Sequence, residues 1–398
     1  MHNHVALITI ALLILTFGLF SNLSERSPIS GPMFFLGMGI LAGPMALSLI
    51  DVQLNTKVVQ TVAEITLIII LFVDASLIKF SELKKVLSGI PARLLMIGLP
   101  LTMLLGTVLA QLLFPSYNIW ALAMLALILS PTDAALGQAV VKSKNVPQRI
   151  KESISVESGL NDGLALPPIL LCIAVLASGG SALTGDGYWL IFMVKQLTIG
   201  PAIGAVVGFV GGKMIDYATD HNWMGSIFHQ LAAISLAILA YSFAEMFHGN
   251  GFIAAFFAGL MLGTKIHIVR ERIQEFGEAQ GQLLSLIIFF LLGISIHRLS
   301  PHWDINTLIY AVLSLTFIRI LPVFLSLIGT ELNLYSKIFI GWFGPRGIAS
   351  ILYMLIVVSE LGVSGYEKLL SVIVLTVLIS TFVHGLSAVF MSKHFADQ

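Results

Sequence analysis

Charged residues are scarce in this chain of 398 residues. Asp, Glu, Lys and Arg make up 11% of it, about half of the share usual in a soluble domain, whereas 57% of the chain is hydrophobic. The 21 basic and 21 acidic residues balance, so no excess charge indicates a nucleic acid or an acidic partner. The composition therefore excludes an ordinary soluble domain and favours an integral membrane protein.

Cysteine is almost absent as well. Cys172 is the single cysteine and lies in an apolar run, which excludes a disulfide framework and a cysteine-based metal site. A basic segment before the first apolar run is also lacking, and that run is long for a signal peptide. We therefore expect it to be the first membrane span and not a cleaved segment.

Apolar runs of about 20 residues, long enough to cross a bilayer as helices, recur along the whole chain. They predict an all-α polytopic membrane protein with about thirteen transmembrane helices, one transmembrane domain over 1–398 and no soluble domain. The expected spans are 4–21, 30–50, 58–78, 90–114, 118–140, 150–177, 190–212, 226–247, 250–264, 277–296, 305–328, 335–359 and 368–391. The ninth is short, so the count carries an uncertainty of one.

Successive loops are alternately rich and poor in lysine and arginine. Because cytoplasmic loops carry an excess of these residues, this pattern predicts the orientation of the chain in the membrane. With the N-terminus outside, only Lys57, Arg298 and Lys368 fall in outer segments. The inner segments then hold Arg26, Lys79, Lys84, Lys85, Arg93, Lys142, Lys144, Arg149, Lys151, Lys213, Lys265, Arg270, Arg272, Lys337 and Lys393. We expect a cell-membrane protein with a cytoplasmic C-terminus.

Two interrupted spans suggest an internal repeat. The fifth contains Ser130-Pro131-Thr132-Asp133 and the twelfth contains Gly344-Pro345-Arg346-Gly347. Paired Gly/Pro interruptions at matching positions are typical of transporters built on inverted repeats. We therefore predict a first repeat of helices 1–6 over 4–177, a linking helix 7 over 190–212 and a second repeat of helices 8–13 over 226–391. In the linking helix, glycines recur every four residues, which favours close helix packing.

The densest group of polar residues is Glu157-Ser158-Gly159-Leu160-Asn161-Asp162 in the sixth span. Ser158 and Asp162 are four residues apart and share a helix face. Pro167 and Pro168 follow and free two backbone carbonyls. Carboxylate, hydroxyl and carbonyl oxygens suit a hard cation, and a deeply placed carboxylate has a raised proton affinity. Such a group can bind a proton or a metal ion in turn, which is the chemical basis of exchange.

Placing a charged side chain in the membrane costs roughly 2.5–3.5 kcal/mol on insertion scales, so each of the other intramembrane charges needs a partner or a function. We expect Glu157 to pair with Arg319. Asp133 either helps to hold an ion through water or caps the helix that resumes after Pro131, and Arg346 offsets the dipole of a half-helix. Glu64 and Asp74 either line an entry funnel for the ion or lie near the membrane interfaces, and Glu245 is expected in contact with water. The histidines are expected mostly in loops, where His221, His229, His248 and His267 are candidate pH sensors.

These motifs resemble the monovalent cation/proton antiporters of family 1, the branch of NhaP and the eukaryotic sodium/hydrogen exchangers. The resemblance rests on Glu157-Ser158-x-x-Asn161-Asp162, Thr132-Asp133, Arg319 and Gly344-Pro345-Arg346-Gly347, and on the apolar segment Gly251–Gly263. It implies an NhaA-like antiporter fold with two crossed unwound helices, a dimerisation domain and therefore a homodimer, and an elevator-type motion. The sequence departs from the larger eukaryotic members in one respect, because it ends soon after the thirteenth expected span; we therefore expect no regulation by a cytoplasmic tail.

The resemblance also implies roles for the site residues. Asp162 carries the ion or the proton, with Ser158, the Thr132 carbonyl and Asn161 beside it, Asp133 acting through water, and Glu157 near the sodium ion and paired with Arg319. No catalytic residue, cofactor or nucleic-acid partner is expected, and the transported Na⁺ and H⁺ are cargo. We predict electroneutral exchange of one Na⁺, or Li⁺, for one H⁺, because Asn161 leaves one titrating carboxylate in this pair. A K⁺/H⁺ antiporter, a channel and an intramembrane hydrolase are the alternatives, in that order.

Overall fold

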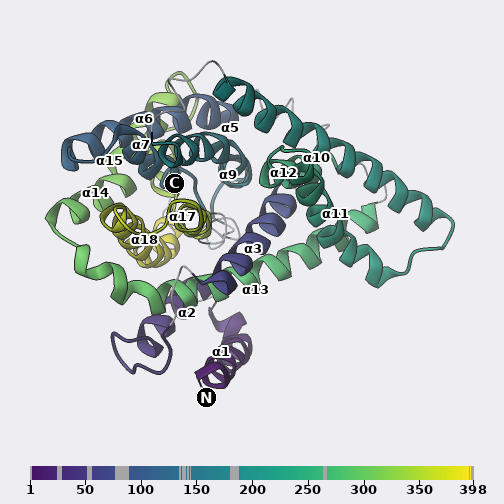
Figure 1. Ribbon diagram of the computed structural model, residues 1–398, viewed down its shortest axis with the longest axis horizontal. Coiled ribbons are helices and arrows are strands. Elements are labelled where there is room, and N and C mark those ends of the chain that lie inside the picture. The colour runs from purple at the N-terminus through teal and green to yellow at the C-terminus, as the bar shows by residue number, and fades with distance from the viewer. Residues whose placement is uncertain are drawn as a thin grey trace. The chain divides into compact units, whose positions relative to one another are not determined.

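The computed structural model describes residues 2–24, 29–51, 56–76, 89–133, 136, 140, 143, 145–179, 188–262, 267–393 and 395. Every regular element within these residues is a helix (Figure 1). The first half holds α1 (His2–Ser24), α2 (Gly31–Ala42), α3 (Lys57–Ser76), α5 (Ile90–Arg93), the π-helix η2 (Leu94–Gly98), α6 (Leu99–Leu113), α7 (Ile119–Ile128) and α9 (Gln148–Ala177). The second half holds α10 (Tyr188–Asp220), α11 (Ser226–Met246), α12 (Gly251–Leu260), α13 (His267–Leu299), the 3₁₀ turn η4 (Ser300–His302), α14 (Ile305–Leu315), α15 (Phe317–Ser326), α16 (Leu334–Trp342), α17 (Ile348–Leu361) and α18 (Glu367–Lys393).

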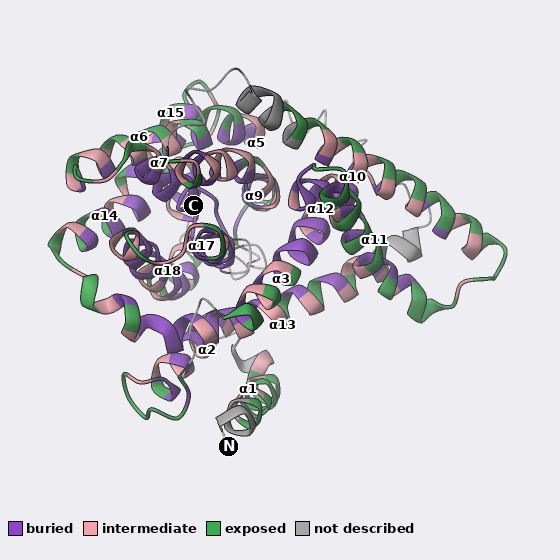
Figure 2. Ribbon diagram, viewed as in Figure 1, coloured by how far each residue is buried: buried purple, intermediate pink, exposed green. Residues whose placement is uncertain are grey.

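The helices overlap the predicted spans, but α2 ends at Ala42, so the prediction of a helical span over 30–50 is wrong for residues 43–50. Among the described residues, 8 helices are long and apolar enough to cross a membrane. Shorter apolar helices occupy the first, second, fifth, ninth and twelfth predicted spans. Large apolar side chains such as Leu19, Met96, Leu112 and Phe390 are exposed, as the many exposed positions in Figure 2 illustrate; lipid is the solvent that suits such a surface. The exact number of crossings stays a prediction.

The chain divides into two compact units. Unit 1 contains residues 1–60, 90–161 and 285–398, and unit 2 contains 61–89 and 162–284. In unit 1, apolar side chains from α5, η2, α9, α15, α16 and α18 form one buried cluster that includes Leu94, Ile154 and Phe339. In unit 2, apolar side chains of α3, α10, α11, α12 and α13 form another, which includes Phe72, Ala254 and Ile273. The two inverted repeats stay a prediction.

The glycines of α10 pack directly on α12 within unit 2. A Cβ atom at Gly204 would meet the backbone of Ala254, and one at Gly208 would meet that of Ala258. Only a residue without a side chain allows two helix backbones to approach this closely. The four-residue spacing of these glycines therefore has the packing role that the sequence suggests.

Three of the predicted spans are not simple rods. The fifth ends its first helix, α7, at Ile128, and residues 130–133 are not helical. The twelfth consists of α16 and α17, joined by the non-helical residues 343–347. The eleventh is divided at Thr316 into α14 and α15, an interruption that the sequence analysis did not predict. Of the fifth span beyond Asp133, most residues lie outside the described part of the chain.

Candidate ion-binding site

The two non-helical segments, 130–133 and 343–347, cross each other inside unit 1. The backbone N–H of Asp133 donates to the Pro345 carbonyl at 2.8 Å. A guanidinium nitrogen of Arg346, Nη1, donates to the Pro131 carbonyl at 2.9 Å and also to the Ser130 carbonyl. Both breaks follow from the prolines, which lack the N–H that a continuous helix needs. The polar backbone groups that the breaks expose satisfy one another.

The charges at this crossing oppose the helix dipoles. Arg346 is fully buried and its guanidinium lies just beyond the C-terminal end of α7, where the partial charge is negative. Asp133 is 5% exposed, and its Oδ2 accepts the backbone N–H of Ile348 at 2.7 Å. That N–H is the first of α17, where the partial charge is positive. Asp133 therefore caps α17, a different helix from the one considered in the sequence analysis.

Gly347 and Gly344 allow this close fit. A Cβ atom at Gly347 would collide with the carboxylate of Asp133, and one at Gly344 would meet the Arg319 guanidinium and the Thr132 side chain. The Gly-Pro-Arg-Gly motif thus combines a helix break, a buried charge and two positions with no room for a side chain.

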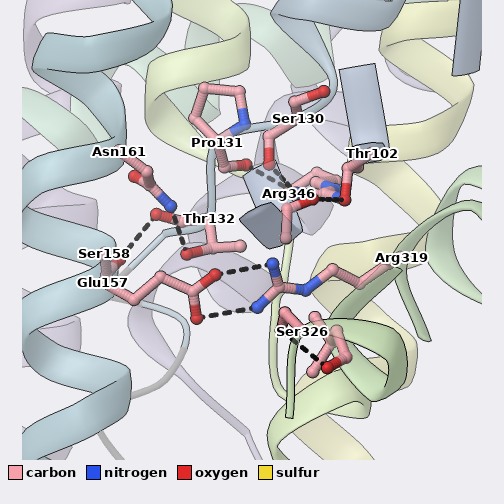
Figure 3. A network of polar contacts seen from close by, with 12 residues as sticks. Thr102, Ser130, Pro131, Thr132, Glu157, Ser158, Asn161, Arg319, Ser326 and Arg346 are labelled. Atoms are coloured by element: carbon pink, nitrogen blue, oxygen red, sulfur yellow. Dashed lines mark hydrogen bonds and ion pairs between the residues drawn. The ribbon is translucent and has the colours of Figure 1, made fainter. Parts of the chain in front are cut away.

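Helix α9 joins the crossing through Thr132. Ser158 Oγ donates to the Thr132 carbonyl at 2.5 Å, and Asn161 Nδ2 donates to Thr132 Oγ1 at 2.7 Å (Figure 3). Both side chains are buried, and Asn161 Oδ1 has no hydrogen-bond partner among the described residues. A buried amide oxygen in that state is costly, and it offers one ligand to a cation. Three of the residues predicted from the sequence therefore meet at one point.

Glu157 and Arg319 form a buried ion pair beside Thr132. Arg319 Nη1 and Nη2 donate to the two carboxylate oxygens of Glu157 at 2.6 and 2.8 Å, and both side chains are 1% exposed (Figure 3). The parallel arrangement of two N–H groups and two oxygens is the strongest form of such a pair. Both oxygens of Glu157 are engaged, which leaves this carboxylate little capacity to bind a cation.

Asp162 follows Asn161 on α9, which runs through it without interruption and continues past Pro167 and Pro168. It is 6% exposed and lies one helical turn after Ser158, on the same face. Because Pro167 and Pro168 cannot donate, the carbonyls of Gly163 and Leu164 lose their usual helical partners. The helix is therefore loosened there but not broken.

The remaining intramembrane acids lie elsewhere. Glu64 accepts a hydrogen bond from the Tyr241 hydroxyl in unit 2. Glu245 is exposed and accepts the N–H of Gly251 at 2.8 Å, which caps α12; its contact with water stays a prediction. Among the described residues no group of three or more His, Cys, Asp or Glu side chains could hold a metal ion, so the acids do not gather into a transition-metal site.

Two polar residues of α18 were missed in the sequence analysis. The N–H of Arg346 donates to Ser380 Oγ at 2.7 Å, and His384 Nδ1 lies 3.1 Å from that same oxygen. The expectation that histidines lie mostly in loops is wrong for His384, which is 1% exposed, and for His229 in α11, which is 4% exposed. The available signal was weak: a serine and a histidine four residues apart share a helix face, but α18 contains several other serines and threonines.

Crossed helix breaks with opposed buried charges, in an all-helical chain of apolar spans, define a polytopic membrane transporter of the NhaA-like antiporter fold. Residues 9–394 match the family described as "Sodium/hydrogen exchanger, transmembrane". The chain therefore belongs to the sodium/hydrogen exchanger family, a family of transporters and not of enzymes.

Several relatives have names that specify an ion. The chain is 28% identical over 332 residues to the K(+)/H(+) antiporter NhaP of Alkalimonas amylolytica, covering 81% of this chain and 55% of the relative. It is 24% identical over 309 residues to a Na(+)/H(+) antiporter of Schizosaccharomyces pombe, covering 70% and 65%. The structure of the sodium proton antiporter MjNhaP1 from Methanocaldococcus jannaschii superimposes with a TM-score of 0.79, 20% identity and full coverage of both chains. The chain spans less than two thirds of the length of the Alkalimonas amylolytica and Schizosaccharomyces pombe proteins.

Proposed function

We propose that this protein is a monovalent cation/proton antiporter in which Asp162 binds the cation and the proton in turn. The observation that carries the proposal is the contact of α9 with the crossed breaks: Ser158 and Asn161 both bond to Thr132, and Asp162 is the next residue of the same helix. An anionic group one turn from a hydroxyl and beside freed carbonyls is a site for a hard cation.

The ligands follow from the oxygens available at this point. We infer that Asp162, the Ser158 hydroxyl, the Thr132 carbonyl and Asn161 Oδ1 surround the cation. The Ser158 hydrogen points at the Thr132 carbonyl, so it has to turn away before both oxygens face one cation. Binding of a cation and retention of that hydrogen bond then exclude each other, which gives the empty and loaded states different contacts between α9 and Thr132.

The charges of the crossing support a stoichiometry of one to one. Glu157 neutralises Arg319 in their buried pair, and Arg346 and Asp133 are each committed to a helix end. Of the acids described at the crossing, we assign Asp162 as the one that binds the transported ion. One site that holds either H⁺ or a monovalent cation moves one charge in each direction, so no net charge crosses the membrane.

We propose Na⁺ as the cation, with Li⁺ as a second substrate and K⁺ as the alternative. Na⁺ and K⁺ use the same oxygen ligands, and some relatives are named as potassium antiporters whereas another is named as a sodium antiporter. The resemblance further supports an elevator-type motion, a homodimer, an outer N-terminus and a cytoplasmic C-terminus. A channel is disfavoured because a conducting filter needs rings of carbonyls or charges, and the sequence contains no motif for such a filter.

Transport by purified protein in liposomes tests this function. An outward proton gradient and a pH-sensitive dye report exchange when Na⁺, K⁺ or Li⁺ is added outside. We expect saturable dequenching in the wild type and none in Asp162→Asn, which removes the charge at nearly constant volume. Glu152→Gln is the matched control, since Glu152 is an exposed acid of the same helix. Wild-type turnover in a folded Asp162→Asn protein refutes the assignment, and a rate that does not saturate with cation indicates a channel.

A further inference from the structure

His229 lies near the start of α11 and is 4% exposed. Its two ring nitrogens contact side chains on two other helices of unit 2. Nδ1 lies 3.2 Å from Nη1 of Arg272 on α13, and Nε2 lies 2.9 Å from Oγ1 of Thr219 on α10. One buried imidazole therefore joins three helices of the same unit.

The hydrogen positions in this network follow from the partners. A guanidinium has only donors, so Nδ1 of His229 has to accept and carries no hydrogen. Nε2 then carries the ring hydrogen and donates it to Thr219 Oγ1, and the Thr219 hydroxyl donates in turn to the Ile215 carbonyl at 2.7 Å. The contacts thus select the neutral imidazole in one tautomer.

Protonation of His229 is incompatible with this arrangement. The added hydrogen would lie on Nδ1 and point at Arg272 Nη1, 3.2 Å away. Two donors would then face each other, and two positive charges would meet beside a buried ring, which disfavours the charged form of the imidazole. Arg272 stays charged at any working pH, so the contact has to open when the imidazole takes up a proton.

We propose that Arg272, His229 and Thr219 form a proton-sensitive latch, which holds the start of α13 against α10 and α11 while His229 is neutral and releases it when His229 is protonated. Residues 267–284 of α13 belong to unit 2 and residues 285–299 to unit 1, so the latch fixes one end of a helix that both units share. The predicted orientation places these residues on the cytoplasmic side, where the latch responds to cytoplasmic pH.

A second contact limits the part of α13 that is released. Gln274 Nε2 donates to the Ser76 carbonyl at the end of α3, at 2.9 Å. Neither partner in that hydrogen bond titrates, so acid does not break it directly. Release therefore concerns the first turns of α13 and not the whole helix.

The other charged groups near the latch lie on each of the elements around it. The turn before α11 contributes one further histidine, and α12, which packs against α11, carries no charged residue. Among the side chains that the structure describes, these groups are Asp74 on α3, Lys213, Asp216 and Asp220 on α10, His221 in the turn, and Glu271 and Glu275 on α13. All of them are retained when His229 alone is changed, so a difference between the two proteins isolates His229.

Amide hydrogen exchange tests the latch, because it reports how often the first turns of α13 open. A free histidine is protonated below about pH 6.5, and each further unit of acid favours a state that takes up the proton by a factor of about ten. We expect opening in the wild type, corrected for chemical exchange, to rise about tenfold between about pH 8 and about pH 5.5. In His229→Asn the rise should stay within about twofold, because the amide oxygen accepts from Arg272 and takes up no proton.

Two further variants sharpen the test. His221→Asn is the matched control, since His221 is an exposed histidine of the adjoining turn, and it should keep the wild-type rise. Arg272→Gln examines the latch from its other side and serves if His229→Asn does not fold. Its amide presents either a donor or an acceptor to Nδ1, so protonation no longer forces the contact open and the rise should shrink. A rise in His229→Asn or in Arg272→Gln that equals the wild-type rise overturns the proposal.

Discussion

The buried pair of Glu157 and Arg319 makes an unequal prediction for its two partners. Its bonds of 2.6 and 2.8 Å and its 1% exposure mean that removal of one partner leaves the other charge buried without its ion-pair partner, at roughly 3–5 kcal/mol. An arginine stays protonated at any working pH, whereas a buried carboxylate can take up a proton. Glu157→Gln should therefore destabilise the protein more than Arg319→Met does.

The position of Arg346 adds to this difference. Its guanidinium lies within electrostatic range of both partners, so Glu157→Gln leaves two buried positive charges, while Arg319→Met leaves Glu157 facing one. An unfolding entropy of about 2 cal/mol/K per residue converts 3–5 kcal/mol into a fall in Tm of roughly 4–6 °C. The double variant Glu157→Gln/Arg319→Met removes both charges, and its Tm should lie above that of Glu157→Gln alone.

Thermal unfolding in detergent at pH 7 measures the four proteins of this double-mutant cycle, with exposed Glu152→Gln as the control. Single-variant effects that add to within about 0.5 kcal/mol in the double variant would show that the two side chains are not coupled. A larger loss from Arg319→Met than from Glu157→Gln would refute the charge argument, even if coupling is found.

Four other outcomes follow from the structure. Low pH should raise the apparent KM for Na⁺ without lowering the maximal rate if both ions compete for Asp162; a falling maximal rate at constant KM would indicate a separate sensor. The Na⁺ gradient that balances a fixed pH gradient should not move when valinomycin and K⁺ impose 100 mV, because a net charge would add roughly 2.3 kcal/mol. Gly204→Val should lower Tm because its side chain meets the backbone of Ala254, and an unchanged Tm would contradict that packing. The hydrogen bond with Lys368 lowers the pKa of Asp304 to about 2, so the stabilisation from this ion pair is complete above pH ~4 and is lost as pH falls toward 2. Because Asp304 is half exposed, Asp304→Asn should cost less than about 1 kcal/mol at pH 7, and the difference in Tm from the wild type should shrink in acid. A difference in Tm that grows in acid would contradict the lowered pKa.

Much of the site could be read from residue types and spacing. Lipid satisfies no backbone group, so apolar runs of spanning length have to be helices. A proline inside such a run has to break or loosen it, and an intramembrane charge requires a partner or a function. Those constraints are local and strong, which is why Asp133, Asp162 and Arg346 stand out in the sequence without any coordinates.

The sequence could not decide which groups meet, because contacts between distant segments depend on how helices pack. Asp133 was expected either to act through water or to cap its own span, yet its carboxylate caps α17, 215 residues away in the chain. Ser380 looks like any small polar residue of an apolar helix, and only the tertiary structure shows that it accepts the N–H of Arg346. The sequence alone thus determined which polar groups the membrane makes expensive, and the fold decided how each is compensated, since hydrogen bonds and ion pairs act over a few ångströms whereas the partners lie far apart along the chain.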